Sequence, residues 1–189
     1  MELKSKDDLT QLIRSYGIIS WEELLNFVQA LPYGRNSNRT DLSLIIKEKK
    51  GTCSSKHAFL KEVADLNKIP DIQLIMGIYK MTETNTPAIG KVLSNNNLHY
   101  IPEAHCYLLM RDKRRDFTNP ESDIRKIEND ILEELQIQPK QVGQFKVDFH
   151  KNFLKQWIME EGIPLSFEEI WRIREKCIQN ISTGISVKK

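Results

Sequence analysis

Three residues of reactive type, Cys53, His105 and Asp116, stand out because of the local patterns around them. Cys53 follows Gly51-Thr52 and opens a stretch whose apolar residues recur at helical spacing. A cysteine in the first turn of a helix is close to unpaired N–H groups and the helix dipole, which favour the thiolate. A thiolate is a nucleophile, so this position predicts covalent catalysis. The alternative is that Cys53 is a small, packed core residue.

A thiol nucleophile needs a base, and the histidines of the chain supply the candidates. His105 lies in the strand-like stretch AHCYLLM, and Asp116 follows it eleven residues later. A tight turn between two antiparallel strands would place the two side chains about 5 Å apart at Cβ, where the carboxylate would orient the imidazole. His57 is a second candidate, but it shares one predicted helix with Cys53 and is more simply a packed residue. His150 is predicted to be a surface or capping residue.

The helices that would position Cys53 lie in the N-terminal part of the chain. Apolar residues at helical spacing predict them, and Ser20 followed by Glu23 has the pattern of a capping box. A stretch rich in turn-forming residues at 32–39 is predicted to be an ordered loop. The predicted helices cover residues 7–16, 20–31, 41–50 and 53–67.

The strands that would carry His105 and Asp116 come next, because the residue pattern changes after Pro70. β-branched and aromatic residues predict strands at 72–81 and 103–112, a loop between them, and a third short strand that ends at Asn119-Pro120. The remaining predictions are a helix at 123–135, a strand at 144–152, a helix at 153–162, a last helix from Ser166 to about 180 with Glu169 completing its capping box, and a frayed tail at 182–189. This order of helices, strands and helices indicates an α+β fold.

Composition excludes several classes of protein. The 189 residues are 40% hydrophobic and 29% charged, which is typical of a globular domain with a sizeable core. The net charge is only +2 and the basic residues are spread along the chain, so we expect no nucleic-acid partner. Three cysteines without regular spacing predict a reducing compartment rather than a disulfide framework. The charged N-terminus and the lack of an apolar run of about 20 residues predict a cytoplasmic protein without a membrane partner.

The stretches GTCSSKHAFL, AHCYLLM and RDFTNP, in this order, resemble the transglutaminase-like superfamily. That family has Gly-x-Cys opening a helix, His followed by Ala or Cys and an aromatic residue on a strand, and Asp-x-Thr on the next strand. The resemblance covers about 51–120 and implies a papain-like α+β fold, in which the nucleophile helix packs on a small antiparallel sheet. We therefore expect one domain over 1–189, with its motif-bearing core at about 40–120 and helical additions at 1–31 and 123–182.

The resemblance also assigns roles to residues. It implies that Cys53 is the nucleophile, His105 the base and Asp116 the orienting acid, whereas Thr118 and Pro120 match the end of the last motif. The family includes cross-linking acyltransferases, peptide-N-glycanases, cysteine proteases and inactive members. Here His-Cys-Tyr replaces the common His-Ala-Trp, and no tryptophan lies just before the nucleophile, which favours hydrolysis over protein cross-linking.

The implied chemistry is acyl transfer from a peptide, protein or small amide, without a cofactor or a metal. The Cys53 thiolate attacks a carbonyl carbon, and the Cys53 N–H is the first donor to the resulting oxyanion. A second donor is expected from the loop at 32–39, with Asn36 and Asn38 as candidates. Arg35 in the same loop would hold a substrate carboxylate or form a salt bridge within the scaffold. The sequence makes no prediction of an oligomeric state.

Two alternatives remain at this point. Cys53, His57, His105 and Cys106 are metal-ligand types, but adjacent residues on a strand point to opposite faces, so His105 and Cys106 would not bind one zinc ion. Cys106, like Cys177, is then predicted to be a packing residue. The second alternative is an inactive transglutaminase-like interaction module, with the helices predicted at 123–135 and 166–180 as docking surfaces.

Overall fold

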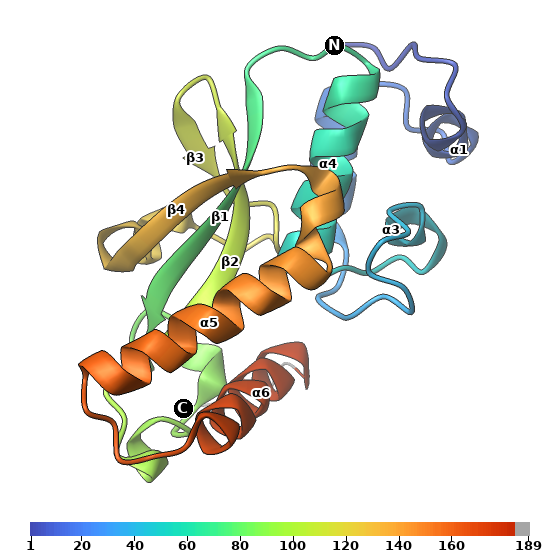
Figure 1. Ribbon diagram of the computed structural model, residues 1–189. Coiled ribbons are helices and arrows are strands. Elements are labelled where there is room, and N and C mark those ends of the chain that lie inside the picture. Colours follow the sequence, from blue (N-terminus) through green and yellow to red (C-terminus); the bar gives the residue numbers. More distant parts are fainter. Residues whose placement is uncertain (184–189) are drawn as a thin grey trace. The chain divides into compact units, whose positions relative to one another are not determined.

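The computed structural model describes residues 1–183 and contains helices and one small sheet (Figure 1). The helices are α1 (Asp8–Ser15), α2 (Trp21–Ala30), α3 (Leu44–Lys47), α4 (Cys53–Leu66), α5 (Gln144–Glu160) and α6 (Phe167–Thr183). The strands are β1 (Ile72–Met81), β2 (Ile101–Met110), β3 (Lys113–Arg115) and β4 (Ile131–Ile137). Short 3-10 helices lie at Pro87–Ile89, Ser94–Asn96, Ile124–Lys126, Glu128–Asp130 and Pro139–Val142. In the predicted frayed tail, Ser182 and Thr183 belong to α6, and residues 184–189 lie outside the described residues.

The four strands form one antiparallel sheet with the order β3-β2-β1-β4, which confirms the α+β class. The strand predicted at 72–81 is confirmed with its bounds, and β2 begins at Ile101. β2 and β3 form a hairpin in which Leu108 lies opposite Arg115 and Met110 opposite Lys113. The two turn residues, Arg111 and Asp112, have φ angles of 47° and 59°. A two-residue turn in which both residues have a left-handed backbone conformation fits the right-handed twist of the strands that it joins.

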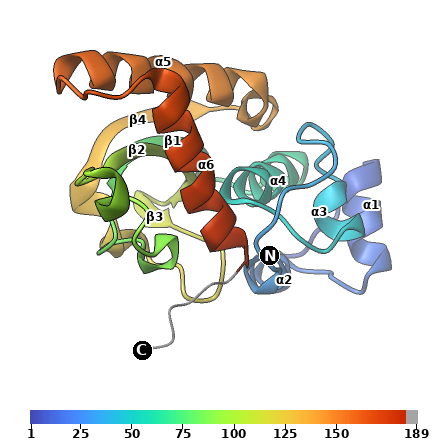
Figure 2. The same ribbon diagram turned by 90° about the horizontal axis from the view of Figure 1, so that it is seen from below.

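The helices predicted in the N-terminal part are confirmed, except that α3 is only one turn long. The Ser20 hydroxyl accepts the Glu23 N–H, and the Glu23 carboxylate accepts the Ser20 N–H, so the predicted capping box begins α2. α4 packs against α1, α2, α3 and the turn at Pro139–Val142 (Figures 1 and 2). It contributes the buried residues Ala58, Phe59, Leu60, Val63 and Ala64 to the core.

The helix predicted at 123–135 is wrong. Two 3-10 helices lie there instead, followed by β4, which pairs with β1. Leu, Glu and Gln are good helix formers, but intrinsic preference determines structure only weakly, and backbone pairing with the neighbouring strand overrides it here. A docking helix at this place, as the interaction-module alternative requires, is therefore not part of the fold.

The strand predicted at 144–152 is also wrong, because α5 runs through it without interruption to Glu160. Its buried residues are His150, Leu154 and Trp157, at helical spacing, which places one face of a continuous helix in the core. His150 is 2% exposed, so the expectation of a surface or capping residue is wrong as well. His150 Nε2 lies 2.8 Å from the carbonyl oxygen of Pro102 and donates its hydrogen to it.

Contacts group the described chain into two compact units. The first comprises residues 1–76, 105–124 and 135–144, and the second comprises 77–104, 125–134 and 145–183. The prediction of one domain over the whole chain stays a prediction. Among residues 1–183, no helix combines the length and apolar character that crossing a membrane requires.

The second unit contains a buried ion pair between Glu103 and Arg174. Arg174 on α6 donates from Nε to Glu103 Oε2 at 2.7 Å and from Nη2 to Glu103 Oε1 at 2.5 Å. Burial raises the pKa of Glu103, but the charge of Arg174 outweighs this effect and lowers the pKa to about 2. Within the same unit, α6 also packs on the turn at Pro87–Ile89 (Figure 2).

Candidate active site

Cys53 is the first residue of α4, and the residues before it determine where the helix begins. Thr52 is the N-cap: its hydroxyl accepts the Ser55 N–H at 3.3 Å, and the Ser55 hydroxyl accepts the Thr52 N–H at 2.9 Å. The Cys53 N–H belongs to the first turn, where helical N–H groups have no acceptor within the helix. Cys53 is 8% exposed, so its thiol lies just below the surface at a positively polarised helix end.

Gly51 lets α4 begin this close to its neighbours. A Cβ atom at Gly51 would lie 2.7 Å from Ile45 Cδ1 and 2.8 Å from Lys56 Cγ. The Gly51 N–H donates to the Pro32 carbonyl oxygen at 3.2 Å. This hydrogen bond joins the start of the 32–39 loop to the segment before Cys53. The glycine of the GTC motif is therefore required for packing rather than for an unusual φ angle.

His105 and Asp116 are hydrogen-bonded, as expected, but their register differs from the expected one. His105 Nε2 lies 2.8 Å from Asp116 Oδ2. Because Leu108 pairs with Arg115, continuing the register places Asp116 opposite Tyr107, and Asp116 is a diagonal neighbour of His105. Asp116 has also left β3, which ends at Arg115. The diagonal distance is bridged because both side chains lean toward each other.

Thr118 holds the other oxygen of this carboxylate. The Thr118 N–H and hydroxyl donate to Asp116 Oδ1 at 2.9 and 2.6 Å. Burial raises the pKa of Asp116, but the charge of His105 and these hydrogen bonds lower it well below its usual range. Asp116 is thus a fixed anion that faces His105.

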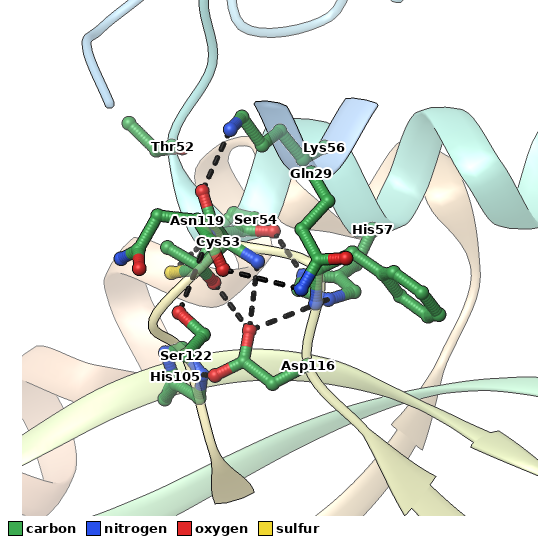
Figure 3. A network of polar contacts seen from close by, with 12 residues as sticks. Gln29, Thr52, Cys53, Ser54, Lys56, His57, His105, Asp116, Asn119 and Ser122 are labelled. Carbon is green, nitrogen blue, oxygen red and sulfur yellow. Dashed lines mark hydrogen bonds and ion pairs between the residues drawn. The ribbon is translucent and has the colours of Figure 1, made fainter. Parts of the chain in front are cut away.

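Cys53 is the third member of the group and interacts with His105 (Figure 3). A hydrogen bond joins the side chains of His105 and Cys53. Asp116 occupies Nε2 of His105, which leaves Nδ1 as the ring nitrogen that the carboxylate does not bind. The structure therefore brings the three predicted catalytic residues together in the order thiol, imidazole, carboxylate.

The charges of the group favour a protonated His105. Burial lowers the pKa of His105, but the charges of Asp116 and Cys53 and the hydrogen bonds to both raise it, to about 10. At neutral pH the imidazole is therefore an imidazolium between two acidic groups. Its side chain keeps 15% of its surface exposed, so His105 is reachable from the solvent.

His57 lies beside the group but has a different role. Its Nδ1 donates to the Cys53 carbonyl oxygen at 2.7 Å, and its Nε2 accepts the Phe117 N–H at 2.8 Å. Burial lowers the pKa of His57 to about 4, so the ring is neutral. Nε2 is 3.6 Å from Asp116 Oδ1, but it carries no proton to share with that carboxylate. His57 therefore connects α4 to the segment after β3 and is not placed to act as the base.

The loop at 32–39 forms hydrogen bonds within itself and with nearby segments. Asn36 Nδ2 donates to Glu48 Oε2 and to the Lys50 carbonyl oxygen, both at 3.1 Å. Asn38 Oδ1 accepts the N–H and the hydroxyl of Thr40 at 3.0 and 2.8 Å. These contacts hold the loop, so a role of Asn36 or Asn38 in oxyanion binding stays a prediction. The role predicted for Arg35, an exposed residue of the loop, likewise stays a prediction.

Cys106 on β2 and Cys177 on α6 are completely buried, which confirms both as packing residues. Within residues 1–183, no cluster of three or more His, Cys, Asp or Glu side chains has an arrangement that would hold a metal ion.

Comparison with known proteins identifies no relative: no family model, no curated protein and no solved structure matches the chain. The geometry and electrostatics of the group around Cys53 therefore carry the functional argument.

Proposed function

We propose that this protein is a thiol-dependent acyl-transfer enzyme that hydrolyses an amide bond through Cys53, His105 and Asp116. The observation that carries the proposal is the connected set of hydrogen bonds from the Cys53 thiol through His105 to Asp116, with the 2.8 Å bond at its acidic end. A thiol at a helix start, a histidine and an orienting carboxylate are the groups that a cysteine nucleophile requires. The proposal includes a papain-like fold of the transglutaminase-core type.

The resting state is a thiolate–imidazolium pair. The Cys53 sulfur attacks the carbonyl carbon of the amide, and the electron pair of the C=O double bond moves to the oxygen. The Cys53 N–H donates to this oxyanion. His105 then gives its Nδ1 proton to the leaving amine as the C–N bond breaks, which leaves a thioester on Cys53 and a neutral imidazole.

Water completes the cycle. Neutral His105 takes a proton from a water molecule, and the hydroxide oxygen attacks the thioester carbonyl carbon. The C–S bond breaks, the acid leaves, and Cys53 returns as the thiolate beside a protonated His105. Asp116 stays ionised throughout and fixes the orientation of the ring. His105 keeps 15% of its side chain exposed, so water has access to the base and serves as the second substrate in this proposal.

Alkylation of the cysteines tests the nucleophile. Iodoacetamide is added between pH 5 and 9, and mass spectrometry measures the rate at each cysteine. We expect Cys53 to react with a midpoint well below the value of about 8.5 for an unperturbed thiol, and far faster than Cys106 or Cys177. Labelling of Cys53 no faster than in the denatured protein contradicts the proposal.

Acylation tests the base. An activated ester such as p-nitrophenyl acetate is expected to acylate Cys53 in the native protein and to release nitrophenol in a burst. The variant His105→Ala is expected to lose at least about 100-fold of this rate, the scale of general acid–base catalysis. Acylation of His105→Ala at the native rate shows that His105 is not the base.

A further inference from the structure

Lys56 is a buried charged residue next to the active site for which the mechanism above has no use. It lies three positions after Cys53 on α4, and it is completely shielded from solvent. Lysine is almost never fully buried unless its ammonium has partners. The sequence shows no sign of this burial, because Lys56 stands in the polar-looking run CSSKH.

The partners of Lys56 are two backbone carbonyl groups from different segments. Nζ donates to the Leu31 carbonyl oxygen at 2.5 Å and to the Thr118 carbonyl oxygen at 2.6 Å. Leu31 is the C-cap of α2, and Thr118 is the residue whose N–H and hydroxyl hold Asp116. The ammonium thus connects α2 and α4 to the residue that positions the carboxylate of the triad (Figure 3).

The charge of Lys56 is balanced at longer range by the acidic groups of the site. Burial lowers its pKa to about 8, whereas the charges of Asp116 and Cys53 raise it. His57, the other titratable neighbour, is neutral, and the charge of Lys56 contributes to keeping it so. A thiolate at Cys53 would therefore have two nearby cations at neutral pH, His105 and Lys56.

We propose that Lys56 is a positioning residue of the triad, which holds Asp116 in place through Thr118 and stabilises the Cys53 thiolate by its positive charge. This inference rests on the proposed role of Cys53 as the nucleophile. It predicts that the reactivity of Cys53 depends on the buried ammonium group of Lys56.

The variant Lys56→Met tests the charge while keeping a side chain of similar length. We expect the pH midpoint of Cys53 alkylation to rise by about one unit, the smaller end of what a nearby opposite charge does to an acid. Below the midpoint, one unit corresponds to about tenfold slower alkylation. Lys56→Arg keeps the charge and is expected to restore most of this shift.

Lys61→Met is the matched control, because Lys61 lies on the same helix and pairs with Asp65. It removes the same charge from the chain and is expected to leave the alkylation midpoint unchanged. An unchanged midpoint in Lys56→Met, with a reactive Cys53 in the native protein, overturns the role of Lys56 and leaves the proposed function intact. An unreactive native Cys53 overturns the proposed function.

A second measurement applies even if Lys56→Met does not fold. NMR of selectively labelled lysine side chains follows the titration of Lys56 in the native protein and in Cys53→Ser. Because charge coupling is reciprocal, we expect a pKa of about 8 in the native protein and a lower value in Cys53→Ser, which lacks the thiolate. Equal values in the two proteins overturn the proposed coupling.

Discussion

His57 and His105 have ring centroids only 6.4 Å apart, yet the protein holds them in different protonation states. Burial disfavours the charged form of each ring, although His105 keeps 15% of its side chain exposed. The difference comes from their partners: His105 faces a carboxylate and a thiol, whereas the two nitrogens of His57 contact backbone groups. A carboxylate stabilises an imidazolium, and a backbone N–H that needs an acceptor stabilises the neutral ring.

The difference between side-chain partners and backbone partners also explains which residue roles the sequence could predict. The grouping of Cys53, His105 and Asp116 could be predicted because each stands in a local sequence pattern with its own chemistry. The role of His57 could not be predicted, because its partners are the carbonyl of Cys53 and the N–H of Phe117. Every residue has the same backbone groups, so a sequence does not show which of them will be a partner. The N–H of Phe117 is brought close to His57 only by the fold.

Asp116→Asn is predicted to lower the pKa of His105. Without the anion, the largest effect that raises the pKa of His105 is lost while burial still lowers it, so the pKa of His105 falls from about 10. A smaller fraction of His105 is then protonated beside the thiol, and alkylation of Cys53 at pH 6 slows. NMR of the His105 ring measures the titration directly.

Thr118→Val is the control for that experiment. It removes only the hydroxyl bond to Asp116 Oδ1 and leaves the charge in place. Its effect on the pKa of His105 is expected to be clearly smaller than that of Asp116→Asn. A His105 that still titrates near pH 10 in Asp116→Asn contradicts the argument.

At the scale of elements, the predictions were correct where a local sequence signal sets the boundary of an element. The helix predicted at 123–135 was wrong because pairing between strands determines the structure there. α2 begins at a capping box, and β1 matches its predicted bounds, because caps and buried apolar runs are visible in sequence. β4 was missed because Ile131–Ile137 is exposed along most of its length and becomes a strand only beside β1. The register of His105 and Asp116 also depends on the two-residue turn at 111–112, which composition alone did not specify.

The Glu103–Arg174 pair joins β2 to α6 inside the second unit and is predicted to be essential for its stability. Their side chains are only 7% and 11% exposed. Arg174→Met leaves a buried carboxylate without its cation, so we expect a loss of about 3–5 kcal/mol in the free energy of unfolding. Urea denaturation measures it.

Glu175→Gln is the matched control, because Glu175 contacts the same guanidinium through Nη1 but is 34% exposed. Loss of such a solvent-exposed pair is expected to cost less than about 1 kcal/mol. Equal losses in Arg174→Met and Glu175→Gln would contradict the importance of burial.

At the scale of the whole molecule, each unit contains one buried, neutral histidine. His57 belongs to the first unit and His150 to the second, and burial lowers the pKa of each to about 4. In the unfolded chain both take up a proton near pH 6.5. Acid therefore favours the unfolded state of both units.

Stability is predicted to fall as the pH decreases from about 6.5 to about 4, because the unfolded state binds more protons in this window. The depressed pKa values of Asp116 and Glu103 extend the loss to lower pH. His105 acts in the opposite direction: its raised pKa stabilises the fold below pH 6.5, and this contribution is lost as the pH rises toward 10. Urea denaturation from pH 4.5 to 7.5 measures the acid side, and a constant free energy of unfolding across that range would contradict the prediction.

The position of β3, the strand just before Asp116, also bears on how readily the protein aggregates at high concentration. β3 is an edge strand, and its residues Lys113, Arg114 and Arg115 are all exposed. An exposed edge has backbone groups that would pair with a strand of another molecule, as happens in aggregation. Three consecutive cations make such an approach by a second copy of β3 electrostatically unfavourable. The short strand before the carboxylate of the proposed triad is thus itself a poor template for pairing with a second molecule.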